Sequence, residues 1–160
     1  MGPDDLRAVM VRDLRAVMRE VSAYASDEDP WREVPGLANS GGTLALHLAG
    51  NIRHYVGAVL GGGDYVRDRD GEFLRRDVPR AVLVDDLAYG VADLERVLPT
   101  LAPATLAAEF PVEVGGRRLT TARMLMHLAT HLAYHLGQLD YHRRAVGPGG
   151  SVGAVSVLEI

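Results

Sequence analysis

Histidines are concentrated in one short segment of the chain. Four of the six lie within residues 124–142, MLMHLATHLAYHLGQLDYH. Residues four apart on a helix lie about 6 Å apart on one face, so His131 and His135 can direct two imidazole nitrogens at one ion. Zinc and similar metals bind such nitrogens at about 2.0–2.1 Å. The spacing therefore favours a pair of metal ligands on one helix.

The same two histidines also allow a structural interpretation. They continue an apolar stripe of the helix and are expected to face the interior, where an imidazole without a partner is costly. On spacing alone, a buried pair satisfied by neighbouring groups is the more frequent case. His127 lies about 12 Å of helix rise from His135, so it is expected to support a ligand or the fold instead of binding the same ion. His142 lies near the helix end, where a positive charge is favoured.

A third ligand has to come from another helix. Residues 46–57, LHLAGNIRHYVG, carry His47 and His54. His47 belongs to the expected inward face, so we predict it as the third ligand and keep His54 as the reserve. Three histidines from two helices leave coordination positions open for water or substrate, which is typical of a catalytic site. Asn51, His54 and Gln138 are the candidate catalytic groups of the pocket, and His54 could shuttle protons.

Several other chemistries are excluded by the residues present. A zincin needs His-Glu-x-x-His, but leucine follows both His127 and His131. A di-iron carboxylate bundle needs inward glutamates, and the histidine segment has none. The chain has no cysteine, which excludes disulfides, thiolate metal sites and a cysteine nucleophile. The glycines at 61–63 close a helix instead of opening one, so they do not form a phosphate-binding loop.

Composition indicates a globular protein. The 160 residues are 48% hydrophobic and 24% charged, and the net charge of −4 is not accompanied by a basic face or tail. These values argue against disorder and against nucleic-acid binding. The charged N-terminal region lacks a signal-peptide core, and no apolar stretch reaches the length of a membrane span. We therefore expect a cytoplasmic protein that acts on a small molecule, without nucleic-acid or membrane partners.

Helical periodicity predicts four amphipathic helices in a single domain of residues 1–160. The helices are expected at 5–25, 43–60, 80–98 and 121–145. They favour an all-α fold, a four-helix bundle with long crossover connections, whose core spans about residues 5–145.

The segments between and after the helices give weaker signals. A small β-hairpin is expected around 109–120, where Gly115–Gly116 offers a turn. The connector RDRD (67–70) is expected to be solvated and paired within itself. The glycine-rich tail, residues 146–160, is expected to be loose or to dock on a partner subunit.

The segment HLATHLAYHLGQLDY, together with LALHLAGNIRHYVG and GGGDYVRDRDGEF, resembles the DinB/YfiT-like superfamily. The resemblance covers about residues 5–145. It implies a four-helix bundle with an unusual crossover, assembled as a homodimer, and one divalent metal ion, commonly zinc or nickel. The implied metal ligands are His47, His131 and His135, and Gln138 belongs to the Gly-Gln pair that follows the last ligand.

The resemblance also implies a chemistry. Proteins of this superfamily include thiol-dependent transferases and isomerases that use low-molecular-weight bacterial thiols, and metal-dependent hydrolases. The leading hypothesis is a divalent-metal-dependent enzyme, similar to thiol S-transferases, that activates a thiol or water on a three-histidine centre. A low-molecular-weight thiol would be its co-substrate. The alternatives are a metal-dependent hydrolase of unknown substrate, a non-catalytic bundle stabilised by metal, and a metal-free dimer whose histidines are structural.

Overall fold

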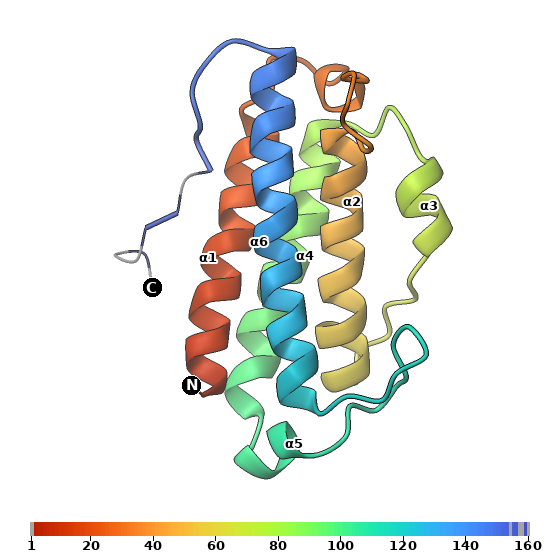
Figure 1. The fold of residues 1–160 in the computed structure, drawn as a ribbon, viewed down its shortest axis with the longest axis vertical. Coiled ribbons are helices and arrows are strands. Elements are labelled where there is room, and N and C mark those ends of the chain that lie inside the picture. Colours follow the sequence, from red (N-terminus) through yellow and green to blue (C-terminus); the bar gives the residue numbers. More distant parts are fainter. Residues whose placement is uncertain (1, 154, 157–158, 160) are drawn as a thin grey trace.

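The computed structural model describes residues 2–153, 155–156 and 159. Four long helices form a bundle, and short helical elements lie in the connections (Figure 1). The long helices are α1 (Pro3–Ser22), α2 (Gly41–Ile52), α4 (Arg80–Val97) and α6 (Thr121–Val146). The short elements are α3 (Arg69–Leu74), α5 (Pro103–Ala107), the 3₁₀ turns η1 (Asp29–Trp31) and η3 (Leu98–Thr100), and the π-helical segment η2 (Arg53–Leu60). The all-α bundle predicted from the sequence is confirmed.

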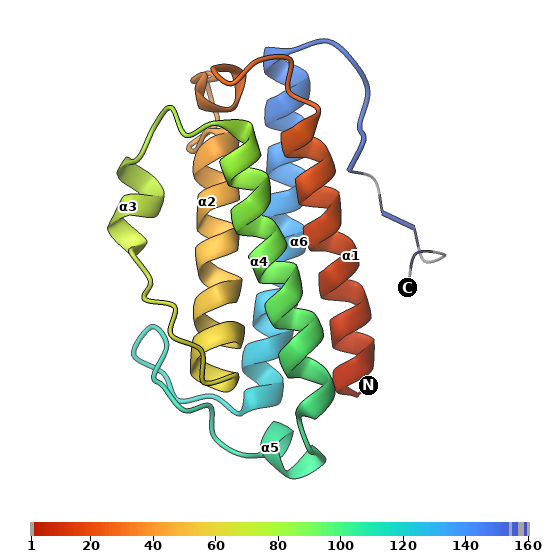
Figure 2. The ribbon, with the colours of Figure 1, turned by 180° about the vertical axis from the view of Figure 1, so that it is seen from behind.

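The long helices form a ring in which α1 and α2 each pack against both α4 and α6. Helices α1 and α6 run in one direction and α2 and α4 in the other, as the colours of Figures 1 and 2 show. Because α2 and α4 are parallel neighbours, the chain between them has to return along the length of the bundle. It does so on the outside, with α3 lying against α2. The expected long crossover is confirmed.

Side chains from all four long helices share one hydrophobic core. The apolar positions that predicted the helices are buried, among them Leu14, Leu48, Leu87 and Leu132. Among the residues that the structure describes, every helix is too short or too polar to serve as a transmembrane span.

Helix α2 departs from the predicted single α-helix. It begins where expected, because the hydroxyl of Ser40 accepts a hydrogen bond from the backbone nitrogen of Thr43 (3.2 Å) and so caps it. Its α-helical part ends at Ile52, and the remaining predicted turns are the π-helical η2. Over so short a segment the apolar spacing does not distinguish the two helix types. At Gly57 a Cβ would lie 2.2 Å from Asp93 Oδ2, so the absent side chain allows α4 to approach η2.

The predicted hairpin is reduced to a turn. Gly115 and Gly116 have φ angles of 58° and 73°, in the left-handed region that a two-residue hairpin turn requires. The backbones of Val114 and Arg117 exchange two hydrogen bonds of 3.0 Å across this turn. In the described part of the chain the pairing is limited to isolated bridges, and no strand forms.

The described part of the C-terminal tail docks on its own chain. Glu20 is fully buried on α1, pairs with Arg143 of α6, and accepts hydrogen bonds from the backbone nitrogens of Val152 (2.9 Å) and Gly153. A Cβ on Gly153 would lie 2.6 Å from Glu20 Cγ, so glycine suits this position. The described part of the tail is therefore not loose, because a buried carboxylate supplies acceptors for its backbone. Docking of the tail on a partner subunit stays a prediction.

Candidate metal centre

Three histidines from two helices converge between α2 and α6. His47 on α2 and His131 and His135 on α6 offer nitrogens that all lie within 4.8 Å of one another. His131 Nε2 is 3.2 Å from His47 Nε2 and 3.1 Å from His135 Nε2. Two nitrogens bound tetrahedrally to one ion at about 2.0–2.1 Å would be about 3.3 Å apart, so these spacings suit a single ion. The structure thus brings together the three residues predicted as ligands.

The outer nitrogens of two of these rings are held by neighbouring side chains. His47 Nδ1 donates to Glu72 Oε2 (3.0 Å), and His135 Nδ1 donates to Gln138 Oε1 (2.6 Å). These bonds assign one proton to each Nδ1 and leave both Nε2 lone pairs facing His131. A single proton on His131 Nε2 cannot satisfy both lone pairs. A cation among the three Nε2 atoms would satisfy them all, so the residues fit a divalent metal.

Burial keeps two of the three converging rings neutral. Desolvation, together with the neighbouring imidazoles, lowers the pKa of His131 to about 4. Desolvation also lowers the pKa of His135, although its hydrogen bond to Gln138 acts in the opposite direction. Because a metal binds the neutral ring, both side chains are in their binding form at neutral pH.

The carboxylate that holds His47 comes from the crossover connection. Glu72 on α3 is 1% exposed and also accepts hydrogen bonds from Arg67 Nε (2.7 Å) and Arg67 Nη2 (2.8 Å). Burial alone would raise the pKa of Glu72, but its hydrogen bonds with His47 and Arg67 outweigh this effect and lower the pKa. Glu72 is therefore an ionised acceptor that orients the ring of His47. The expectation of a solvated RDRD connector is wrong at Arg67, whose side chain is 9% exposed.

A glycine of α2 makes room for this carboxylate. A Cβ at Gly50 would lie 2.1 Å from Glu72 Oε1, closer than two such atoms can approach. The ring of Phe73, next along α3, lies 5.0 Å from the ring of His47, so α3 covers this side of the centre. Sequence reasoning missed Glu72. The available signal was Gly50 itself, because glycine is costly inside a helix and often marks a close approach.

Two of the predicted pocket groups lie near the triad along the helices. Gln138 bonds His135 directly and so orients one of the three converging rings. Asn51 is one helical turn after His47 and is 8% exposed. Among the described residues, its Oδ1 has no hydrogen-bond partner. Asn51 thus offers an unused acceptor in a buried position.

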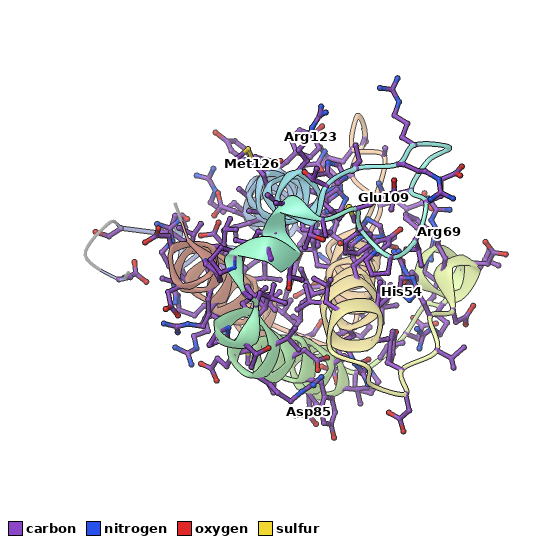
Figure 3. The ribbon with its side chains drawn as sticks, turned by 90° about the horizontal axis from the view of Figure 1, so that it is seen from below. His54, Arg69, Asp85, Glu109, Arg123 and Met126 are labelled. Carbon is purple, nitrogen blue, oxygen red and sulfur yellow. The ribbon has the colours of Figure 1, made fainter. Side chains whose placement is uncertain are left out.

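His54, the reserve ligand, is not part of the converging cluster. It lies on η2, where its ring centroid is 4.7 Å from that of Tyr55. Figure 3 shows it on the outer side of η2, towards α3. Desolvation and the charge of Arg67 lower the pKa of His54, so this half-buried imidazole is neutral at pH 7.

The remaining histidines of α6 do not join the triad. His127 is exposed, with its ring 5.8 Å from that of His131. His142 is fully buried, donates from Nε2 to the Arg32 carbonyl (2.9 Å) and accepts at Nδ1 from the Tyr24 hydroxyl (2.7 Å). Burial lowers the pKa of His142. The expected role as a cation at the helix end is therefore wrong, and His142 is a neutral core residue.

Comparison with known proteins bears on this centre. The family model described as mycothiol-S-transferase matches residues 5–147 and so includes all three converging histidines. This is a DinB/YfiT-like family, which confirms the resemblance seen in the sequence motifs. No match was found among curated proteins.

Proposed function

Because the chain belongs to the mycothiol-S-transferase family, we propose that it joins the sulfur of a low-molecular-weight thiol to an electrophilic small molecule. The reaction would take place at a divalent metal held by His47, His131 and His135. The observation that carries the proposal is the convergence of their three Nε2 atoms, two of which present lone pairs to the third. Nitrogen ligands of this kind suit zinc and nickel.

The chain's own residues have defined tasks in this scheme. Glu72 and Gln138 hold the rings of His47 and His135 so that Nε2 faces the centre. A divalent ion bound there would act as a Lewis acid and lower the pKa of a thiol. The unused Oδ1 of Asn51 would accept a hydrogen bond from the substrate. The neutral ring of His54 would accept the thiol proton and pass it to solvent.

We also propose that the protein is a homodimer that works in the cytoplasm, where such thiols stay reduced. The support for a dimer is the outer face of α6, where Met126, Tyr134 and Tyr141 are 49%, 65% and 66% exposed. No exposed residue of α6 between Arg123 and Arg144 is Asp, Glu, Lys or Arg. Interface centres are depleted in charge and rich in tyrosine and methionine. Light scattering should give twice the chain mass for wild type and the single chain mass for Tyr134→Arg.

The proposed function is tested by metal content and thiol conjugation in the same preparations. Tag-free wild type, reconstituted with zinc or nickel, should bind about one ion per chain and conjugate mycothiol to an electrophile such as chlorodinitrobenzene. His131→Ala should lose both properties. The matched control is His127→Ala, one turn earlier and exposed, which should keep both.

The other possible outcomes would support other functions. Bound metal without conjugation would favour a metal-dependent hydrolase or a non-catalytic bundle stabilised by metal. Absence of metal from reconstituted wild type would leave the three histidines as core residues and refute the proposal.

A further inference from the structure

A cavity lies above the metal centre, at the end of the bundle where α2 begins. Its volume is about 570 Å³, within the range of sites for small molecules. The walls are Trp31, the loop that precedes α2, the first turn of α2 and the connection that follows α3. The lining includes Trp31, Glu33, Asn39, Ser40, Thr43 and Arg76.

The lining combines an aromatic ring with polar groups of both signs. The indole of Trp31 is fixed in place, because its Nε1 donates to the Val78 carbonyl (3.1 Å) and its ring packs on Gly42, where a Cβ would lie 2.7 Å away. Arg76 bonds backbone carbonyls of its own segment, and among the described residues Glu33 makes no ion pair. The cavity thus offers a carboxylate and a guanidinium whose charges do not neutralise each other.

Two features connect this cavity with the metal centre. Thr43 in its wall is one helical turn before His47, about 6 Å along α2. A second cavity of about 160 Å³ shares the loop residues 36–39 with the first and is also lined by Gln138, which holds His135. The loop 36–39 therefore borders both the outer cavity and the space next to a metal ligand.

We propose that the outer cavity binds the hydroxyl-rich body of the thiol co-substrate, with the sulfur directed past loop 36–39 to the metal centre. This inference rests on the proposed function and assigns the substrate's binding site. The family's thiol, mycothiol, consists of N-acetylcysteine joined by an amide bond to an amino sugar and an inositol. Glu33 accepts hydrogen bonds from such hydroxyls, and Arg76 and Asn39 donate to their oxygens. Electrophilic acceptors share no comparable pattern of hydroxyl groups, so the polar lining favours the thiol.

The test compares three probes by calorimetry on zinc-loaded protein: mycothiol, its thiol-free glucosaminyl-inositol body, and N-acetylcysteine. Two variants alter the outer cavity alone, Arg76→Ala by removing a donor and Glu33→Ala by removing an acceptor. Both should weaken binding of mycothiol and of the thiol-free body at least about tenfold, without changing N-acetylcysteine binding or zinc content. Arg75→Ala, which removes an exposed arginine outside the cavity, is the matched control and should bind all three probes as wild type does.

The outcomes separate this inference from the proposed function. Variants that bind mycothiol as tightly as wild type, in a protein that still conjugates it, would overturn the cavity assignment alone. Weakened binding of N-acetylcysteine by the same factor would also overturn it, because the effect would then lie at the metal centre. If wild type conjugates no thiol, the proposed function fails, and binding of the thiol-free body still tests the cavity assignment. Binding that wild type shows and Arg76→Ala loses would support the assignment. Equal binding by both proteins, or no binding by wild type, would overturn it.

Discussion

Replacement of Glu72 by glutamine tests whether a carboxylate in the crossover connection controls the metal centre. The side chain is 1% exposed and bonds His47 Nδ1 at 3.0 Å and Arg67 at 2.7 and 2.8 Å. Glutamine keeps the shape but removes the charge and presents an amide donor to one of these partners. Changes in such supporting groups lower metal affinity by about 10–100-fold, which corresponds to about 1.4–2.7 kcal/mol.

The same substitution also affects folding, so the two effects have to be separated. Arg67, whose side chain is 9% exposed, loses its counter-charge, and removal of one partner of a buried pair costs about 3–5 kcal/mol. The double variant Glu72→Gln/Arg67→Met removes both charges and should recover much of the stability without recovering metal affinity.

The assay is competition for zinc with a chromophoric chelator, beside urea denaturation of each variant. Asp86→Asn is the matched control, because Asp86 also pairs with an arginine, Arg53 (2.8 Å), and makes no contact with the triad. An apparent zinc affinity of Glu72→Gln within about twofold of wild type would refute the reasoning. So would recovery of zinc affinity in the double variant, because the single variant would then have acted through stability.

Three further predictions concern close packing, protonation and a buried ion pair. Gly50→Ala should lower zinc affinity as Glu72→Gln does, because its Cβ would lie 2.1 Å from the Glu72 carboxylate; unchanged affinity in the same competition would contradict this. Burial lowers the pKa of His142, so the unfolded chain binds the proton more readily, and stability falls as the pH drops below the unfolded pKa of about 6.5. In metal-free protein, the urea concentration at the unfolding midpoint should fall less between about pH 7.5 and about pH 5.5 for His142→Gln than for wild type. Equal decreases would refute the conclusion that His142 is buried in its neutral form. Glu20→Ala leaves the buried charge of Arg143 without its partner and should lower the free energy of unfolding by about 3–5 kcal/mol in urea, whereas a loss below about 1 kcal/mol would mean that solvent replaces the pair.

The long helices and two of the three converging histidines could be predicted because their signals are local. Apolar periodicity gave 80–98 and 121–145, and the structure has Arg80–Val97 and Thr121–Val146. The fixed geometry of a helix brings His131 and His135 together at a spacing of four. The prediction of His47 required a choice between His47 and His54, and it rested on the expected inward face of the helix.

The groups that orient the three histidines could not be predicted in the same way. Glu72 reaches His47 because the crossover folds against α2, and no periodic pattern in a charged connector encodes that contact. Arg67 was expected to be solvated for the same reason. The turns after Ile52 are π-helical, which means that their hydrogen bonds join residues five apart instead of four. The spacing of apolar residues in the sequence does not reveal this difference.

The hydrogen bonds around the triad also determine its charge. Glu72 acts through the ring of His47 instead of as a direct ligand, and its negative charge is matched by Arg67 at 2.7 Å. Imidazole ligands contribute no negative charge, so a divalent ion held by the three rings would keep its full attraction for an anionic sulfur. An unpaired carboxylate at the same position would place a negative charge behind His47 and oppose thiolate binding. The pairing of Arg67 with Glu72 therefore serves the proposed chemistry as well as the fold, because it lets a carboxylate orient a ligand without lowering the positive charge of the centre.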